Sequence, residues 1–421
     1  MSENIPIQRP LDQDFVQLAR KQMLSFGIWP LKYLEGIDNK LYLAHSWFVA
    51  IAYHIMFLLQ LLYVKTHSSA SIYDIGHMMI LVTMSFAVQT RLFGQLFNMK
   101  QYGSLFKEFF ETLHLSNYPH HDEKSVKILH NCEKSAKFLF IAFAGLTGLG
   151  VVVFNVAPMI LNYRSGAYQS GGETALETSL AFSLPFDYKH NIYNWAIVAS
   201  IHAIVSYTVI GVIISQDCFL FYFILHILGH MEIMKEDFKS MLQKYKIREE
   251  EDEKQVGEKV LFVSQEEDHE VYDKLKRSVD HHIQLINFVV LIQDVYGLTL
   301  LSNYVFDVAG SCILLFELTQ LTIESLLRYS LFLVGTFGQL YVNSVFIDQL
   351  VSVSDELRDV AYAIPWELLG RRSRFVLRMF LMRAEHPLRL TAFGVADVSV
   401  ATMTQIIKTS FSYFTMLQTL E

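Results

Sequence analysis

The sequence has little charge, few cysteines and no segment that would separate domains. Only 18% of its 421 residues are charged, whereas soluble globular chains are nearer a quarter charged. Its three cysteines, Cys132, Cys218 and Cys312, are too few for a disulfide framework, and their spacing fits no zinc motif. No Pro-, Gly- or Ser-rich linker divides the chain. These absences exclude a disordered protein and disfavour a soluble enzyme of two or three domains.

The motifs of catalysis are also missing. The sequence has no phosphate-binding glycine-rich loop and no Gly-x-Ser-x-Gly nucleophile motif. The adjacent pairs His120–His121 and His281–His282 have no Cys or carboxylate at ligand spacing. We therefore expect no enzyme, no cofactor and no metal site. Basic clusters fall in the connections between apolar segments, where membrane topology explains them better than a nucleic-acid partner does.

What the sequence has in abundance is apolar segments, because 52% of its residues are hydrophobic. A helix needs roughly 20 apolar residues to cross the hydrocarbon core of a bilayer. Six runs with few or no charges meet this need: 41–64, 75–90 with a continuation to 99, 138–163, 191–216, 283–316 and 329–347. A seventh, weaker span covers 397–420 and carries Lys408 in its middle. The fold class predicted is an all-α membrane protein with seven transmembrane helices.

The Lys and Arg residues predict the orientation. Of the 34, 29 precede the first span or lie in the connections after spans 2, 4 and 6, and four lie in the other connections. Basic connections stay cytoplasmic, and residues 1–40 lack the pattern of a secretory signal. We expect a cytoplasmic amino terminus, an extracellular carboxyl terminus and a multi-pass protein of the plasma membrane. This orientation is opposite to that of G-protein-coupled receptors. Residues 217–282, with 16 acidic and 10 basic residues, are interpreted as a solvated loop.

The seventh span has a polar face. Its polar residues recur at helical steps of three and four once Ala401 is included: Asp397, Thr404, Lys408, Ser412, Thr415 and Thr419. A charge in mid-membrane costs several kcal/mol unless it faces protein or water. The face therefore either lines a wet path or bonds to neighbouring helices within a bundle, and the sequence leaves both open. A pore would need a ring of subunits, in which Met416 and Leu420 would form an apolar constriction.

The outer halves of spans 2 to 5 are rich in aromatic and sulfur-containing side chains. This mixture suits a small apolar ligand, since aromatic rings offer broad contact and Met adapts its shape. Packing between helices is the competing explanation. The candidate ligand contacts are Met79, Phe86, Thr147, Val151, Phe154, Tyr207 and Tyr304.

The mixture of arginines and apolar side chains in 365–396 predicts an amphipathic helix that starts at Pro365. It could lie on the membrane surface beside anionic lipid or pack inside the cell and join subunits. We favour packing, because arginines and apolar residues are too closely interleaved for one broad lipid-facing side. The candidate assembly residues are Tyr362, Trp366, Arg371, Arg372 and Arg383. The predicted division is a cytoplasmic segment 1–40, spans 1 to 6 over 41–347, a cytoplasmic anchor 348–396 and the last helix 397–421.

The closing third of the chain resembles the insect odorant receptors. The most specific match is the run KTSFSYFTML at 408–417, and Gly27, Ile28, Trp29 and Pro30 are similar to the family's entry into its first helix. Further matching positions are Ser354, Tyr362, Trp366, Arg371, Arg372, Met379, Met382, Arg383, Pro387, Leu388 and 390–392. One departure is Tyr341–Val342, where many relatives have Tyr-Cys.

The resemblance implies a subunit of a ligand-gated, non-selective cation channel. In that family an odour-tuned subunit joins a shared co-receptor in a heterotetramer of sensory-neuron dendrites, a volatile odorant binds in the outer half, and the last helix lines the pore. Met416 would then stand at the narrowest apolar ring and Thr419 at the polar ring beyond it. The ending at 418–421 resembles a tuned subunit. A gustatory-type receptor channel and a membrane transporter are the alternatives.

Overall fold

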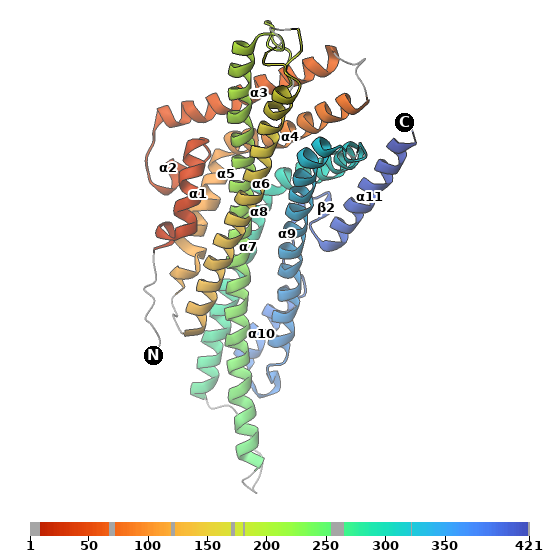
Figure 1. Cartoon of the computed structure of the whole chain (residues 1–421). Helices are drawn as coiled ribbons and strands as arrows, with labels where there is room; N and C mark the ends of the chain where they lie inside the picture. The colour runs from red at the N-terminus through yellow and green to blue at the C-terminus, as the bar shows by residue number, and fades with distance from the viewer. Residues whose placement is uncertain are drawn as a thin grey trace.

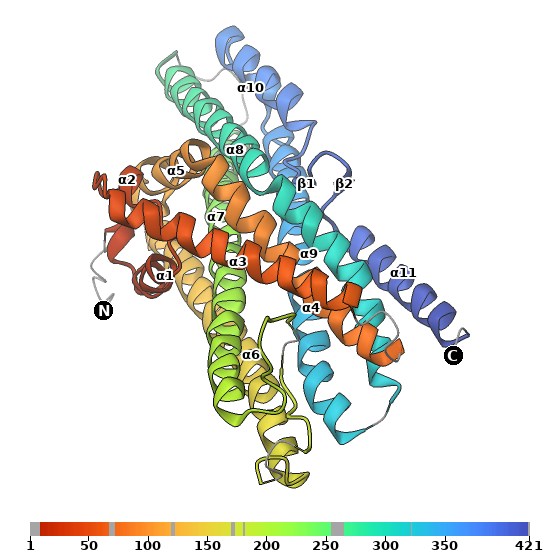
Figure 2. The same ribbon diagram turned by 90° about the horizontal axis from the view of Figure 1, so that it is seen from above.

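The computed structural model describes residues 9–66, 72–118, 123–169, 173–179, 182–253, 265–320 and 322–419, and they are almost entirely helical (Figures 1 and 2). The α-helices are α1 (Asp14–Ser25), α2 (Leu31–Leu34), α3 (Lys40–Thr66), α4 (Ile72–Phe97), α5 (Met99–Glu108), α6 (Glu123–Arg164), α7 (Ile192–Glu253), α8 (Gln265–Leu318), α9 (Ile323–Tyr362), α10 (Arg371–Ala384) and α11 (Val400–Gln418). Short helical turns are η1 (Pro10–Asp12), η2 (Phe109–Leu113), η3 (Leu115–Asn117) and η4 (Trp366–Leu368).

Six helices, α3, α4, α6, α7, α8 and α9, are long and apolar enough to cross a membrane. They coincide with the first six predicted spans, which confirms those spans. Helices α6, α7 and α8 have 42, 62 and 54 residues, more than twice the roughly 20 that a bilayer needs. The interpretation of 217–282 as a loop is wrong up to residue 253 and from residue 265, where the chain is helical. Charged side chains are unfavourable in lipid, but this does not prevent a helix outside the membrane, because Glu, Lys, Arg and Gln are strong helix formers.

Helix α7 packs against α6 and α9, with α6 running beside it (Figure 2). All seven side chains at 218–224 are buried, as expected of a helix that is apolar on every side. The amino-terminal helix α1 packs against this stretch, and its Phe15 ring lies 4.7 Å from the ring of Tyr222. Residues 1–40 are therefore not a loose tail where the structure describes them.

The segment between α1 and α3 explains one of the matching motifs. Gly27 has φ +72°, and a Cβ there would lie 2.8 Å from the Cα of Ser46, so only glycine fits. Trp29 is buried, and its Nε1 donates to Glu35 Oε1 over 3.0 Å. Arg20 donates to both oxygens of Glu35. The hydrogen bonds of Trp29 and Arg20 to Glu35 therefore hold in place the segment that leads into α3.

The amphipathic helix predicted over 365–396 is shorter at both ends, because α10 covers only Arg371–Ala384 and the strands of a hairpin lie within 391–397. Residues 365–370 form the turn η4 and extended backbone, and α10 begins only at Arg371. The cause is Gly370, whose N–H donates to Asp268 Oδ1 at 2.8 Å, and whose position leaves no room for a Cβ beside that carboxylate. Helix α10 buries Ser373, Leu377, Phe380 and Ala384 against α8 and α9, so one narrow face packs on its own chain.

A small hairpin leads from α10 to α11. Strands β1 (Thr391–Ala392) and β2 (Ala396–Asp397) pair antiparallel, with Phe393 and Gly394 at positive φ in the turn. They are the only strands in the described ranges, and the all-α prediction misses them. Helix α11 starts later than the predicted span, and the Ser399 side chain caps it by accepting from the N–H of Thr402. It lies at the edge of the molecule beside α8 and α9 (Figures 1 and 2).

Candidate ligand cavities and pore helix

Two small cavities lie between α4, α6, α7 and α9, with α3 adding to the wall of the first and α8 to the wall of the second. We call the first the outer cavity, because it lies nearer the connection between α6 and α7, and its volume is about 50 Å³. Apolar side chains form most of its wall, among them Val151, Phe154 and Phe332. The rings of Phe154 and Phe332 meet edge to face at 5.4 Å. This wall offers the broad aromatic contact that a small apolar ligand needs.

Two hydrogen-bonded pairs add polarity to the outer cavity. Tyr329 Oη and His77 Nδ1 are 2.8 Å apart, and Ser85 Oγ donates to Gln60 Oε1 at 2.8 Å. All four side chains line the cavity. A ligand with one donor or acceptor would find a partner here, while the remaining wall selects by shape.

The second, deep cavity has a volume of about 70 Å³ and shares Met84, Ile210 and Phe332 with the outer cavity. Thr147 and Gly150 of α6 form part of its wall. Its far end is polar, with Asp217 of α7 and Gln339 of α9. The two cavities therefore form a series that runs from the end of the bundle nearest the α6–α7 connection to a buried carboxylate.

Three of the seven predicted ligand contacts line these cavities. Thr147 lines the deep cavity, and Val151 and Phe154 line the outer cavity, at helical steps of four and three. The other four do not. Met79, Phe86 and Tyr207 are exposed on the surface of the chain. Tyr304 is buried but lines neither cavity.

Sequence reasoning missed His77, Tyr329, Gln60 and Ser85. Their signal was available, since polar side chains within apolar spans tend to face protein rather than lipid. The rotation of the helices was not available, because spans that are apolar on every side do not reveal which side faces inward.

Helix α11 turns its polar face away from its own subunit. Lys408, Ser412, Met416 and Thr419 are exposed, and Leu420 lies outside the described residues. The buried residues are Ile406 and Ser410, and the Ser410 hydroxyl lies 3.4–3.5 Å from the carbonyl oxygens of Asp307 and Val308 in α8. The helix is therefore attached to its subunit by one face only.

The candidate assembly residues lie on the surface of the chain. Arg371, Arg372 and Arg383 are exposed, as are Tyr362 and Trp366 with 69% and 44% of their surface accessible. The Arg374 guanidinium lies over the Trp366 ring at 5.9 Å. Exposed aromatic and arginine side chains of this kind are common at protein interfaces.

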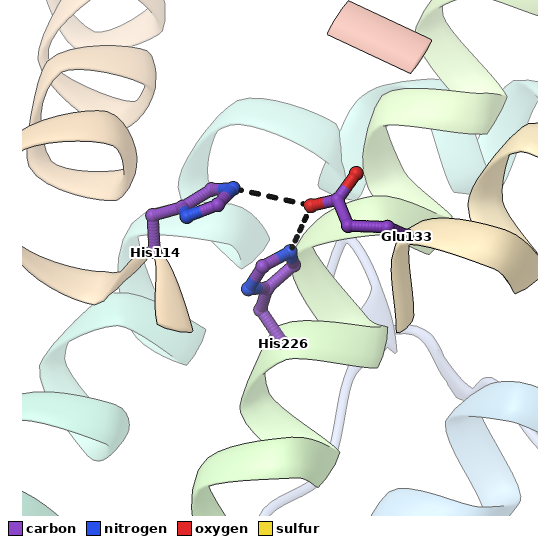
Figure 3. Close-up of side chains that lie close together, drawn as sticks. All are labelled: His114, Glu133 and His226. Carbon is purple, nitrogen blue, oxygen red and sulfur yellow. Dashed lines mark ion pairs between the residues drawn. The ribbon is translucent and has the colours of Figure 1, made fainter. Parts of the chain in front are cut away.

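A further cluster joins His114, which caps η3, to α6 and α7, and sequence reasoning missed it. Figure 3 shows the rings of His114 and His226 directed at the Glu133 carboxylate. Their Nε2 atoms lie 3.3 and 3.6 Å from Glu133 Oε1, and Tyr222 Oη donates to the same oxygen at 2.5 Å. The three candidate ligand atoms fall within 4.8 Å of one another, close enough to hold a metal ion.

The hydrogen bonds from backbone amides to the two histidine rings argue against a metal ion at this cluster. The N–H of Leu115 donates to His226 Nδ1 at 3.1 Å, and that of Ser116 donates to His114 Nδ1 at 3.2 Å. With both Nδ1 atoms acting as acceptors, the proton of each neutral ring is on Nε2, facing Glu133. A metal would need those Nε2 lone pairs, and metal-bound histidines donate from the other nitrogen. The cluster is a clamp in which His114 Nε2 donates to Tyr222 Oη at 2.8 Å and Tyr222 in turn donates to Glu133. Burial lowers the pKa of His114.

Of the two adjacent histidine pairs, only His281–His282 lies in the described residues. His281 Nε2 lies 3.1 Å from His230 Nδ1, a contact between α8 and α7 rather than with its neighbour His282. His120 and His121 lie outside the described residues.

Comparison with known proteins identifies the family. The family model described as "7tm Odorant receptor" matches residues 71–411. The chain belongs to the insect odorant receptor family. Membership confirms the predicted family, a multi-pass membrane protein and a protein that is not an enzyme.

Individual relatives of this odorant receptor are distant. Odorant receptor 67c of Drosophila melanogaster is 24% identical over 36% of this chain and 38% of its own length. Odorant receptor 67a of the same species is 28% identical over 35% of this chain and 36% of its own. The matches thus span little more than a third of these curated relatives.

The fold is shared more widely than the sequence. The olfactory receptor OR5 of Machilis hrabei has a TM-score of 0.76 at 15% identity, covering 97% of this odorant receptor and all of OR5. The OR5 complex with eugenol gives 0.78 at 14% identity, with the same coverage. This odorant receptor therefore has the OR5 fold.

Proposed function

We propose that this odorant receptor is an odour-tuned subunit of a ligand-gated, non-selective cation channel. A small, volatile, largely apolar ligand binds in the outer and deep cavities. Ligand binding opens a central pore that α11 lines together with the last helices of neighbouring subunits, one or more of them a shared co-receptor. In this proposal α11 is the seventh transmembrane helix, the amino terminus is cytoplasmic and the carboxyl terminus is extracellular.

The placement of α11 carries the proposal. Its exposed face holds Lys408 and a row of hydroxyl groups, and the Lys408 ammonium has no acidic partner among the described residues. A charged, hydroxyl-bearing face is unfavourable against lipid, so it needs water or another subunit. A ring of such helices around a symmetry axis supplies both. The alternative in which this face packs inside a monomeric bundle is unsupported, because α8 and α9 contact the opposite face.

The cavities support the ligand class. Their walls are mostly aromatic and aliphatic, and eugenol, a small aromatic phenol, is bound by OR5, which has the same fold. The two hydrogen-bonded pairs of the outer cavity would receive one polar group of such a ligand. Thr147, Val151 and Phe154 are the predicted contacts that this site retains.

Assembly and location complete the proposal. Tyr362, Trp366, Arg371, Arg372 and Arg383 would contact neighbouring subunits below the membrane. The apolar side chains exposed on α3, such as Phe48 at 70%, would contact lipid. The assembled channel would reside in the plasma membrane of sensory-neuron dendrites.

Expression in oocytes tests the proposal. We expect inward cation current in response to members of a volatile panel that includes eugenol, and only when a co-receptor subunit is present. Labelled uptake of a panel compound without current would contradict the channel and support a transporter. A ligand-evoked current equal with and without the co-receptor would contradict the assembly.

A further inference from the structure

A buried arginine connects three transmembrane helices next to the deep cavity. Arg91, in α4, is only 2% exposed. Its Nη2 donates to Asp217 Oδ1 in α7 and to Asn303 Oδ1 in α8, both at 2.9 Å, and its Nη1 donates to the carbonyl of Ile213 at 3.3 Å. Ionisable groups inside a membrane protein are costly and are commonly functional. The proposed ligand contacts and pore residues do not include these side chains.

One end of this network opens on the deep cavity. Asp217 and Gln339 both line that cavity, and the Gln339 amide donates to Asp217 Oδ2. A ligand that enters the deep cavity would press on the same carboxylate that holds Arg91. The network therefore reaches the proposed ligand site directly.

The other end reaches α11 through α8. Asn303 lies one helical turn before Asp307 in α8. The Ser410 hydroxyl, on the buried face of α11, lies 3.5 Å from the Asp307 carbonyl oxygen and 3.4 Å from that of Val308. A shift or rotation of α8 at Asn303 would thus move the surface on which α11 rests.

The network is incompletely paired, which favours more than one arrangement. Arg91 Nε and Asn303 Nδ2 are buried and have no hydrogen-bond acceptor among the described side chains and backbone. Unpaired buried donors raise the free energy of the arrangement that contains them. A second arrangement, in which these donors find acceptors, can therefore lie close in energy, as a two-state switch requires.

We propose that Arg91, Asp217, Asn303 and Gln339 form the connection through which a ligand in the deep cavity moves α8 against α11. The inference rests on the proposed function and adds to it the residues that transmit the signal. They are positioning residues, since α8 and α11 carry the effect to the pore. The alternative is a purely structural role, in which the network only fastens the helices together.

A set of three variants at the α4–α8 contact separates these roles. Asn303→Leu removes the acceptor for Arg91, and Asn303→Asp keeps an acceptor oxygen at the same place. Ser302→Ala is the matched control, because it removes the neighbouring α4–α8 hydrogen bond from Thr90 Oγ1 to Ser302 Oγ and leaves Arg91 untouched. Each receptor is expressed in oocytes with the co-receptor, and current is divided by surface-labelled protein.

With the strongest activator of the volatile panel, we expect maximal current per receptor to fall at least fivefold in Asn303→Leu. Asn303→Asp and Ser302→Ala should stay within about twofold of wild type, a difference below 0.5 kcal/mol in the open–closed equilibrium. Equal losses in Asn303→Leu and Ser302→Ala would overturn the proposal.

A double variant tests whether the two ends belong to one path. Gln339→Leu acts at the cavity end and leaves the Arg91–Asp217 pair in place, so it also serves if Asn303→Leu does not reach the surface. If both residues act on a single path, the double variant Asn303→Leu/Gln339→Leu should reduce maximal current no further than the stronger of the two single variants. Losses that multiply would show two independent structural defects and would overturn the proposal.

A measurement without ligand keeps this test separate from the proposed function. Cys132, Cys218 and Cys312 are all buried, so an engineered Lys408→Cys offers an exposed thiol on α11. We expect Asn303→Leu or Gln339→Leu to change its labelling rate by a cationic methanethiosulfonate at least threefold, with Ser302→Ala unchanged. Equal rates in all backgrounds would contradict the connection, even if no panel compound evokes current.

Discussion

The cavities and α11 place their functional side chains by opposite rules. The cavities are lined from six helices that are apolar on nearly every side, and their shape depends on how each helix is rotated. Helix α11 is amphipathic, and its polar residues recur at a fixed helical step. The comparison teaches that a periodic site can be located in a sequence, whereas a site assembled from dispersed apolar contacts needs the packed structure.

The largest effect should come from a substitution that enlarges the outer cavity. Phe154→Ala removes a buried ring from its wall and with it the contacts that the ring would make to a bound ligand. A loss of about 1.4 kcal/mol of binding free energy raises the dissociation constant tenfold. We expect the activator concentration for half-maximal current to rise about tenfold or more. Tyr207→Ala is the control, because that predicted contact is exposed outside the cavities. Equal shifts in both would break the distinction between lining and surface residues.

Reversing the charge on α11 should have the next largest effect. Lys408→Glu changes the field along the proposed pore in each copy of the subunit, and we expect single-channel conductance to change about threefold. Lys408→Arg keeps the charge and should match wild type. Conductance identical in Lys408→Glu and wild type would place this residue away from the ion path.

A smaller effect is expected at the proposed apolar constriction. Met416→Ser replaces an apolar side chain with a hydroxyl group, which favours wetting of the closed pore. We expect resting current without ligand to rise about twofold, with Met416→Leu unchanged. Resting currents that are the same in all three receptors would argue against a gate at this position.

The smallest effect concerns the clamp of His114, Glu133 and His226. Burial lowers the pKa of His114 below its ordinary value of 6.5, so the folded state binds protons less readily than the unfolded chain. The stability from this group is fully present above pH 6.5 and is lost as pH falls below it. We expect the thermal midpoint of solubilised receptor to fall between pH 7.5 and about 5.5, less steeply in His114→Phe. His386→Gln, at an exposed position, should keep the wild-type slope, and three equal slopes would contradict this role.

Much of the architecture could be predicted from the sequence because lipid imposes length and polarity on each span. The six apolar spans and the face of α11 follow from that constraint. The start of α10 could not, since it depends on the contact between Gly370 and Asp268 across about a hundred residues. The same holds for the clamp at His114, whose partners come from two other helices, and for the rotation that exposes Met79, Phe86 and Tyr207.

Cysteine scanning of α11 in the assembled channel tests the central claim most directly. Single cysteines at Thr404, Lys408 and Ser412 on the exposed face are compared with cysteines at Met403 and Ile407, which pack towards the core. A cationic thiol reagent applied during ligand-evoked current should block the channel through the first group and leave the second unaffected. Block through Met403 and Ile407, with none through Lys408 and Ser412, would contradict a pore lined by the polar face of α11.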